Sequence, residues 1–373
     1  MDNKRPTWAE IDLKAIHHNL QTIRKAAVPA RVMAIVKANA YGHGVHEVAK
    51  ACLQEGVEHL GVATLDEALA VRRDGVAVPI LILGPVGKEH AQTAVDWNLR
   101  ITVFDLAMAQ ALSDAAIKSS KSAYVHIKLD TGMGRVGFPP NTETVEQIVN
   151  ISRLPGIKLE GIFTHFASAD KEDKSKSLKQ LQLFNDLIAE LEKQKVDIPL
   201  KHCSNSAALI DLPEARFNMV RAGIILYGLY PSPYIRQELF KVIPAMTLKS
   251  KISFLKKLAT GATVSYGCTW QCNRETTVAT VPIGYADGYR RLLSNKAFAA
   301  VRGQRVPLIG TVCMDQCMFD VTEVEGVSEG DEIILFGKSE DLVTADELAE
   351  IEGTINYEIV CAVSSRVPRI YIS

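Results

Sequence analysis

Between residue 31 and about residue 230, short apolar runs rich in β-branched residues alternate with longer segments of helical periodicity. The runs are almost continuously apolar, as expected for strands whose two faces are both buried in a parallel sheet. The apolar periodicity predicts helices over 46–54 and 65–73, and the second opens with Thr64-Leu65-Asp66-Glu67, a capping box. Eight strands are predicted, at 31–37, 59–64, 79–84, 100–104, 123–129, 158–166, 200–204 and 219–226.

Eight strand–helix repeats predict an α/β domain of the (β/α)8 TIM-barrel type, a fold that typically needs about 250 residues. We assign residues 13–238 to this domain. A doubly wound open sheet explains the same alternation, and the pattern alone does not separate the two folds.

After about residue 240 the helical patterns become scarce, and β-branched residues alternate with polar ones between Gly-bearing turns. This texture is typical of antiparallel strands, and we place four of them at 247–255, 276–282, 305–311 and 332–336. The predicted fold class is therefore α/β + β. A C-terminal, mainly antiparallel β domain would comprise residues 239–373, together with residues 1–12.

Composition narrows the possible functions. A length of 373 residues agrees with two domains, and 42 Lys and Arg against 43 Asp and Glu argue against a nucleic-acid-binding protein. No apolar run approaches the ~20 residues that cross a bilayer, so no membrane association is expected. The N-terminus shows no apolar core of signal-peptide length, and the seven cysteines are odd in number. We therefore expect a cytoplasmic protein with reduced thiols.

The carboxyl ends of the predicted strands carry polar residues, and function in a barrel collects at that end. Lys37 follows an apolar strand that would partly desolvate its amine, which lowers a lysine pKa and provides a nucleophile or base. A lysine that marks the exit of the strand to solvent is the alternative. The other polar strand ends are Arg135, His165, 204–206 and 221–224.

One motif in this region imitates a dinucleotide site. Residues 132–137 read G-x-G-x-x-G after a strand, but the fingerprint needs its third glycine inside a helix. Pro139 and Pro140 follow at once, and a residue that precedes proline avoids helical geometry. We therefore do not expect NAD to bind there.

Two other patterns imitate metal sites. If Cys268/Cys272 and Cys313/Cys317 lie on strands, the members of each pair are roughly 13 Å apart, too far to share one zinc ion. We interpret these cysteines as small buried hydrophobes. The His43-x-x-His46 pattern is flanked by glycines and is interpreted as a turn, so no metal is expected.

A larger set of motifs resembles one family. In the family's order and over residues 7–370, the chain is similar to the alanine racemases through VKANAYGHG (36–44), LDTGMGR (129–135), THF (164–166), SNSA (204–207), RAGI (221–224), VSYG (264–267), GYADGY (284–289), CMDQ (313–316) and NYE (356–358).

This resemblance implies an isomerase that interconverts L- and D-alanine with pyridoxal 5'-phosphate and supplies D-alanine for cell-wall (peptidoglycan) synthesis. Lys37 would bind the cofactor covalently and serve the D-alanine side, while Tyr266 would serve the L-alanine side. Two bases are expected because a proton leaves one face of a planar carbanion and returns to the other. With a reference pKa near 10, Tyr266 needs cationic neighbours, and His165 and Arg221 would supply that charge.

The resemblance also implies how the cofactor and substrate are held. Arg221 would face the pyridine nitrogen and leave the ring unprotonated, because an arginine does not deliver that proton. The remaining cofactor contacts would be Tyr41, His165, Asn205, Ser206, Gly223, Ile224 and Tyr357. Arg135 and Met314 would bind the substrate carboxylate, and Lys128, which is carbamylated in many relatives, would orient Arg135. His202 would support Arg221, and Asp315 and Tyr285 would lie behind the residues that contact the substrate.

Family members are homodimers in which each active site draws on both chains, so the resemblance implies the same here. A racemase of broader specificity remains an alternative. A barrel-type decarboxylase is disfavoured by Arg221 and Tyr266. A non-catalytic protein that binds pyridoxal phosphate is disfavoured by Tyr266.

Overall fold

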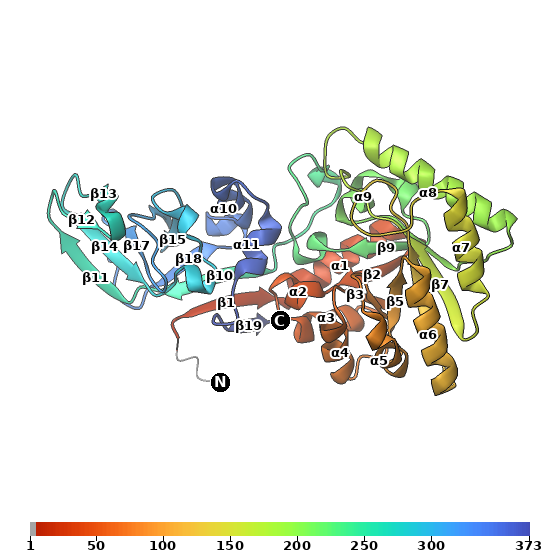
Figure 1. Ribbon diagram of the computed structural model, residues 1–373. Helices are drawn as coiled ribbons and strands as arrows, with labels where there is room; N and C mark the ends of the chain where they lie inside the picture. Colours follow the sequence, from red (N-terminus) through yellow and green to blue (C-terminus); the bar gives the residue numbers. More distant parts are fainter. Residues whose placement is uncertain (1–4) are drawn as a thin grey trace.

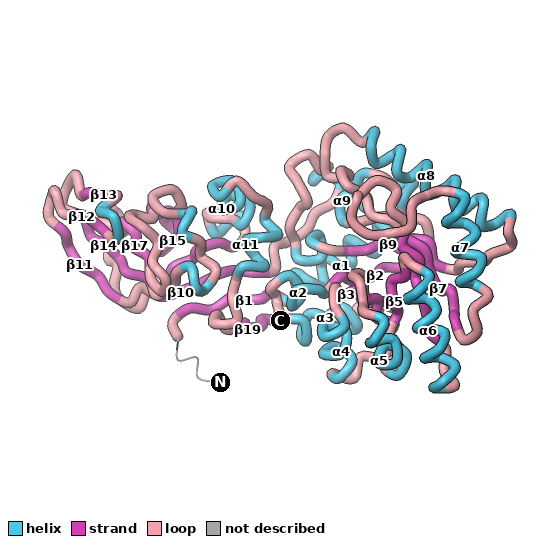
Figure 2. Tube along the Cα trace, viewed as in Figure 1, coloured by secondary structure: helices cyan, strands magenta, loops and turns pink. Residues whose placement is uncertain are grey.

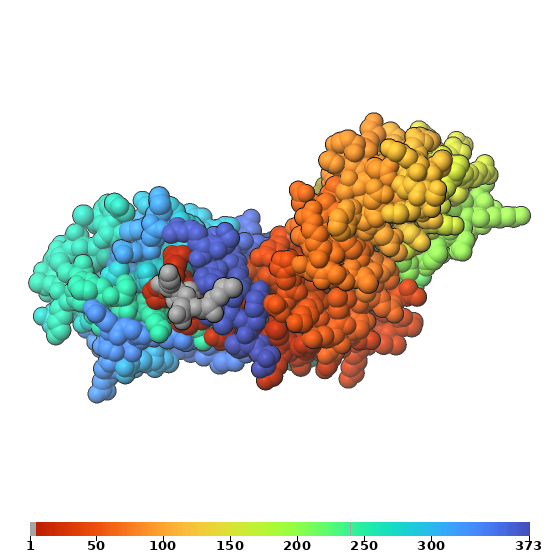
Figure 3. Space-filling view, turned by 90° about the horizontal axis from the view of Figure 1, so that it is seen from below, coloured from red at the N-terminus to blue at the C-terminus, as the bar shows by residue number. Residues whose placement is uncertain are grey.

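The computed structural model describes residues 5–373, which form two lobes (Figures 1 and 3). One lobe holds most of the first 240 residues. The other holds the C-terminal part of the chain, and the first described residues lie against it in the space-filling view. A single cluster of buried apolar side chains runs through both lobes, from Ala9 to Val367.

Eight strands form the sheet of the first lobe, and each neighbouring pair in it is parallel. Their order is β8-β7-β6-β5-β4-β3-β2-β9. A hydrogen bond from Arg221 N–H on β9 to the Ser204 carbonyl just after β8 (3.1 Å) joins the two ends of this order. The predicted barrel is confirmed, and the open-sheet alternative is wrong. The strands are β2 Arg31–Ile35, β3 His59–Val62, β4 Ile80–Ile82, β5 Arg100–Val103, β6 Ala123–Lys128, β7 Ile157–Phe163, β8 Leu200–His202 and β9 Met219–Ala222.

Helices surround these strands (Figure 2). Side-chain caps start several of them, including the predicted capping box of Thr64 and Glu67 at the start of α4. Helix α4 has the predicted bounds, and α3 begins one residue earlier than predicted. The helices are α1 Leu13–Ala27, α2 Lys37–Tyr41, α3 Val45–Gln54, α4 Leu65–Arg73, α5 Ala91–Asp96, α6 Leu106–Ser119, α7 Thr142–Ser152, α8 Ser175–Lys193 and α9 Ser206–Asp211.

Several barrel strands end earlier than predicted. The apolar run over 219–226 is strand only to Ala222, and Ile224–Tyr227 form a 3-10 helix. The run over 158–166 leaves the sheet after Phe163, so His165 lies in the following loop. The reason is that the loops at this mouth are buried as well, so an apolar run continues past the last sheet residue.

The second lobe is built on a six-stranded sheet of order β16-β15-β18-β10-β1-β19 and a three-stranded sheet of order β11-β14-β17. Pairing is antiparallel except between β1 and β19. The mainly antiparallel β architecture is thus confirmed. The strands are β1 Thr7–Asp12, β10 Met246–Lys251, β11 Phe254–Leu258, β12 Thr263–Val264, β13 Trp270–Gln271, β14 Thr276–Val281, β15 Phe298–Val301, β16 Gln304–Pro307, β17 Cys317–Asp320, β18 Glu332–Phe336 and β19 Arg369–Ile372.

Two expectations for the strands of this lobe need correction. The strand predicted over 247–255 is two strands in different sheets, β10 and β11, separated where Ile252 bonds to the loop before β18. The strand predicted over 305–311 ends at Pro307, because the following residues leave β15 and bond to β17, with Ile309 N–H donating to the Met318 carbonyl. Helices are present as well: α10 (Ala345–Glu352) and α11 (Asn356–Ala362).

Helix α11 packs against the first turn of the barrel. A Cβ on Gly42 would lie 2.2 Å from the Val360 carbonyl oxygen, so only glycine permits this approach. The two lobes therefore meet beside the loop that follows Lys37. Among the described residues, no helix is long and apolar enough to span a membrane.

Candidate active site

A cavity of about 550 Å³ opens at the carboxyl ends of the barrel strands. Most residues singled out from the sequence line it, although they come from distant parts of the chain. They are Lys37, Tyr41, Lys128, Arg135, His165, Asn205, Ser206, Arg221, Gly223, Ile224 and Tyr357.

Lys37 begins an unusual turn. The four residues after it all have left-handed backbone angles, with φ between 51° and 54°. For residues with a side chain, this conformation costs roughly 1–2 kcal/mol each. Two side chains hold the turn: Glu67 Oε1 accepts from Ala38 N–H (2.7 Å), and Asn39 Oδ1 accepts from Val45 N–H (2.9 Å). The strain is concentrated beside the lysine, as is common at functional sites.

The amine of Lys37 is half-buried in the cavity wall. Burial, followed by the nearby charge of Arg135, lowers its pKa, and Glu67 opposes this shift. A lowered pKa increases the share of free amine near neutrality. The geometry therefore favours a reactive lysine over a lysine that only marks the exit of a strand.

Arg221 lies on β9 and is buried, with both Nη atoms occupied by protein acceptors. Nη1 donates to the carbonyl of His202 (2.7 Å) and to its Nδ1 (2.9 Å), and Nη2 donates to the carbonyls of Thr164 and Cys203 (both 2.8 Å). Burial lowers the pKa of Arg221 to about 10, so it stays cationic near neutrality. Its Nε takes part in none of these bonds, while the side chain lines the cavity.

The charge expected on His165 is not supported by the structure. Its Nδ1 lies 3.2 Å from Arg221 Nη2, so it accepts from the guanidinium. Burial, followed by the charge of Arg221, holds the pKa of His165 well below its usual value of 6.5. The positive charge bonded to His165 is therefore that of Arg221, and a neutral His165 that accepts at Nδ1 carries its proton on Nε2.

A small polar cradle lies where β8 and β9 end. Ser206 Oγ accepts from the N–H groups of Gly223 (3.1 Å) and Ile225 (3.4 Å). A Cβ on Gly223 would lie 3.0 Å from the Tyr41 hydroxyl and 3.4 Å from Ser206 Oγ. Tyr357 reaches this point from α11, with its ring centroid 6.1 Å from that of Tyr41. Hydroxyls beside a glycine, where no side chain fills the space, are suited to a phosphate.

Arg135 stands in a loop organised by one carboxylate. Asp130 accepts four backbone N–H bonds of 2.8–3.0 Å, from Gly132 through Arg135. Helix α7 starts only at Thr142, so no helix follows the G-x-G-x-x-G motif directly, as predicted. The loop places the Arg135 side chain in the cavity wall.

Lys128 is buried at the end of β6, with its Nζ 2.6 Å from the Leu129 carbonyl. Burial, followed by the charge of Arg221, lowers its pKa to about 8.

Four candidates lie elsewhere: Tyr266, Tyr285, Met314 and Asp315 are absent from the cavity wall. Tyr266 begins a short 3-10 helix between β12 and β13, at the end of the second lobe remote from the barrel (Figure 1). Its side chain is 67% exposed and that of Met314 is 53% exposed. Within one chain these residues therefore do not meet Lys37.

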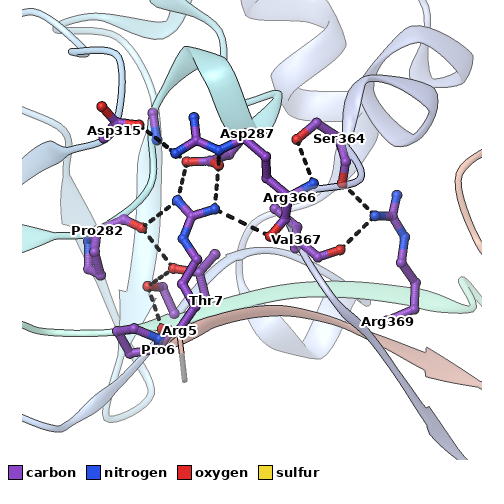
Figure 4. Close-up of polar contacts among 12 residues, drawn as sticks. Arg5, Pro6, Thr7, Pro282, Asp287, Asp315, Ser364, Arg366, Val367 and Arg369 are labelled. Atoms are coloured by element: carbon purple, nitrogen blue, oxygen red, sulfur yellow. Dashed lines mark hydrogen bonds and ion pairs between the residues drawn. The ribbon is translucent and has the colours of Figure 1, made fainter. Parts of the chain in front are cut away.

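The loop that bears Met314 is held by a charged cluster (Figure 4). The buried carboxylate of Asp287 accepts from both Nη atoms of Arg5 (each 2.6 Å), and Arg366 bonds to Asp315 (2.6 Å). The N–H of Ala286 donates to the Met314 carbonyl (3.0 Å). The exposed residues thus stand on an ordered loop.

Sequence reasoning missed several residues around this cavity. Leu83 and Phe163 line it, but as apolar residues at strand ends they carry no chemical signal. Cys361 lines it from α11, one helical turn after Tyr357, a spacing that was visible once a helix was assigned. Glu67 was identified only as a cap, although it also holds the turn after Lys37.

The cysteine interpretation is partly wrong. Cys272 and Cys317 are buried, but Cys268 is exposed and Cys313 is half-buried. The strand assumption fails for Cys268, which lies in the 3-10 helix that follows β12. Among residues 5–373, no cluster of three or more His, Cys, Asp or Glu side chains has a metal-binding arrangement.

Two family models match this chain, one over each lobe. Residues 11–231 match the family described as "Alanine racemase, N-terminal domain", and residues 245–371 match "Alanine racemase, C-terminal domain". The alanine racemase of Methanococcus maripaludis is 47% identical over 98% of this chain and 99% of its own. That of Desulforamulus reducens is also 47% identical, over 99% of this chain and 100% of its own.

Solved structures agree with this. An alanine racemase of Clostridium difficile superimposes with a TM-score of 0.94 at 42% identity, covering 98% of this chain and 96% of its own. The Bacillus anthracis alanine racemase with bound L-Ala-P gives a TM-score of 0.93 at 39% identity, covering 100% and 96%.

Proposed function

Because this chain belongs to the alanine racemase family of isomerases, we propose that it interconverts L-alanine and D-alanine with pyridoxal 5'-phosphate at the barrel cavity. The D-alanine would supply cell-wall synthesis. One observation supports the proposal most directly: Lys37 with its lowered pKa, the cationic Arg221 and the cradle of hydroxyl groups all line the same cavity.

The cavity fits this cofactor at each end. Lys37 provides the amine that the cofactor's aldehyde requires. The hydroxyls of Ser206 and Tyr41 would take the phosphate, in the space beside Gly223 that a Cβ would fill. Arg221, whose two Nη atoms are occupied by the protein, would offer its Nε–H to the ring nitrogen. When bound, the cofactor withdraws electrons from the Cα of an amino acid.

The residues of this chain would then bind the substrate and move its proton. Arg135 would bind the carboxylate, which matches the forked donors of a guanidinium. Lys37 would remove or return the Cα proton on one face. Arg221, with a pKa near 10, would keep its proton and leave the ring nitrogen unprotonated, which limits electron withdrawal.

A second base is needed on the opposite face, and this chain's own Tyr266 does not line the cavity. We infer that the partner subunit's Tyr266 and the partner's Met314 complete the site in a homodimer. Their exposure on the free lobe supports this inference. His165, neutral with its proton on Nε2, would donate to that tyrosine oxygen, with Arg221 behind it as the cation.

The activity is tested by NMR with the purified protein, pyridoxal phosphate and L-alanine in deuterated water. Exchange of the α-proton together with growth of D-alanine is expected, and Lys37→Ala should abolish both. Release of carbon dioxide from lysine or ornithine would instead indicate a decarboxylase, and racemisation of larger amino acids at equal rates would indicate broad specificity. Absence of any reaction after the cofactor has bound would refute the proposal.

The shared site is tested by mixing two inactive chains. A Lys37→Ala chain and a Tyr266→Phe chain should together form one hybrid site with both bases and recover part of the activity. Subunit exchange is verified with differently tagged chains. No recovery after verified exchange would contradict a site built from two subunits.

A further inference from the structure

A file of buried polar side chains crosses the interior of the barrel, starting at Arg221. Arg221 Nη1 lies 2.9 Å from His202 Nδ1, and His202 Nε2 lies 2.9 Å from His126 Nδ1. His126 Nε2 lies 3.0 Å from Glu160 Oε2. Glu160 in turn accepts two bonds from Arg100, of 3.1 and 3.2 Å.

The file connects the two mouths of the barrel. Arg221 lines the cavity at the carboxyl ends of the strands. Glu160 lines a separate hollow that also contains Pro29, Pro79 and Pro199, each of which precedes a strand. The carboxylate therefore stands at the opposite end of the barrel from the proposed chemistry, where conserved features normally serve stability.

The two ends of the file determine the direction of every hydrogen bond in it. A guanidinium only donates and a carboxylate only accepts. His202 must accept at Nδ1 from Arg221, so its proton is on Nε2. His126 then accepts at Nδ1 and carries its own proton on Nε2, which it donates to Glu160. Both imidazoles are completely buried, which holds their pKa values below 6.5 and keeps them neutral.

Two local features of β7 make room for this arrangement. The pairing register shifts between Val125–Leu159 and His126–Gly161, which leaves Glu160 without a partner on β6. Such an irregularity redirects a side chain. The next residue is Gly161, where a Cβ would lie 2.3 Å from His126 Nδ1. A side chain at this position would displace the imidazole at the centre of the file.

We propose that Glu160 is a positioning residue for the reaction, because it fixes the protonated nitrogen of His126 from the end opposite Arg221, and thereby supports the proton on His202 Nε2 and the orientation of Arg221. This inference rests on the proposed function, in which Arg221 faces the cofactor ring. Without an acceptor at residue 160, a proton on His126 Nε2 has no hydrogen-bond partner, so this tautomer loses the bond that stabilises it. If both rings then reversed, the N–H on His202 Nδ1 would oppose the N–H of Arg221 Nη1 at 2.9 Å.

The first test is the distribution of ring protons in the protein without cofactor, read from the ¹⁵N NMR shifts of the histidine rings. The unsubstituted protein should show His126 and His202 as neutral rings with the proton on Nε2. Assignment uses the loss of each signal in His126→Gln and His202→Gln. A proton on Nδ1 of either ring would overturn the proposal before any kinetic measurement.

The second test compares substitutions at and beside Glu160. Glu160→Leu removes the acceptor, and Glu160→Gln keeps an oxygen that accepts from His126. Arg100→Leu is the matched control, because it breaks the same ion pair and lowers stability but leaves the carboxylate. Gly161→Ala is a second probe that removes no polar group and displaces His126.

In Glu160→Leu, at least one ring proton should move to Nδ1, and the visible absorption of the bound cofactor should shift. Its kcat should be about tenfold lower than that of the unsubstituted protein, while its KM should stay within about twofold. Gly161→Ala should do the same, while Glu160→Gln and Arg100→Leu should keep the ring protons and kcat close to those of the unsubstituted protein. A tenfold loss corresponds to ~1.4 kcal/mol.

Ring protons unchanged in Glu160→Leu would overturn the proposal, as would an equal loss of kcat in Arg100→Leu, which would indicate a structural role. If Glu160→Leu does not fold, Gly161→Ala decides in the same way. Absence of racemisation by the unsubstituted protein would refute the proposed function, while the NMR result on the ring protons would stand independently.

Discussion

The carboxylate of Glu67 should couple the stability of the barrel to the reactivity of Lys37. Its oxygens accept from the N–H groups of Ala38 and Ala63 (both 2.7 Å) and of Thr64 (3.3 Å). The first of these bonds holds the left-handed turn that begins after the lysine. Glu67→Ala removes all three bonds.

The expected magnitude follows from these contacts. A hydrogen bond to a charged group contributes about 1.5–3 kcal/mol when buried. Glu67 is only half-buried, so the low end applies to its two short bonds, and the sum is ~2–3 kcal/mol. Thr64→Ala is the control: it removes the cap at the start of α4, worth about 1 kcal/mol, without touching Ala38.

The turn should also relax once its clamp is lost, because each left-handed residue costs roughly 1–2 kcal/mol. Lys37 would then shift, and kcat should fall about tenfold or more, whereas Thr64→Ala should stay within about twofold. The charge acts in addition. Glu67 raises the pKa of Lys37, so Glu67→Gln should lower that pKa further. When L-alanine is the substrate, Lys37 must be protonated to return the Cα proton, so the basic limb of the kcat profile in that direction should move to lower pH.

The assays are urea unfolding and pH-dependent racemisation kinetics on Glu67→Ala, Glu67→Gln and Thr64→Ala. Equal losses of stability and of kcat in Glu67→Ala and Thr64→Ala would show that Glu67 acts only as a helix cap. A shift of the basic limb to higher pH in Glu67→Gln would refute the electrostatic argument.

Three further predictions concern the cavity and the barrel interior. Gly223→Ala should weaken pyridoxal phosphate binding about tenfold by fluorescence titration, since the new Cβ would lie 3.0 Å from the Tyr41 hydroxyl; unchanged affinity would exclude a phosphate at this cradle. Burial raises the pKa of Glu160, but hydrogen bonds from His126 and Arg100 outweigh this effect and lower the pKa to about 2. The ionised carboxylate therefore stabilises the folded protein above about pH 4.5, and this stabilisation is lost as the pH falls towards 2. Urea unfolding should therefore show Glu160→Gln less stable than the unsubstituted protein by about 3 kcal/mol near pH 6, with the gap closing near pH 2.5; a gap independent of pH would refute this. Lys128, with a pKa of about 8, should add carbon dioxide in bicarbonate buffer, seen by ¹³C NMR and absent in Lys128→Ala; no carbamate signal in the unsubstituted protein would contradict the prediction.

The local pattern of apolar and polar residues was sufficient to predict much of the architecture. Alternating apolar runs and helical segments predicted a barrel followed by an antiparallel domain, because the period of apolar residues reports the type of each element. The capping box at Thr64 was recognisable for the same reason, since its partners lie three residues apart. Lys37 stood out as a charge directly after a buried strand. The motifs then pointed to the family.

What the sequence left undecided depends on contacts between distant segments. The strand ends at Ile35, Phe163 and Ala222 were overestimated, because the loops beyond them are as buried as the strands. Tyr357 joins the cavity only because α11 packs beside Gly42, and Tyr266 stays outside it because β12 and β13 lie at the far end of the other lobe.

The file from Arg221 to Arg100 shows the same division most clearly. In the sequence its members are separate polar residues on different strands, and each was compatible with an ordinary core position. Closure of the barrel brings each member within 3.2 Å of the next. Only then does the order of donors and acceptors determine where each proton lies. The sequence by itself determined which elements form and where the lysine stands, since both are local properties of the chain. The tertiary structure decided which charged groups are buried next to one another and which donors meet which acceptors. Both depend on distances between remote segments, which the periodicity of the sequence does not encode.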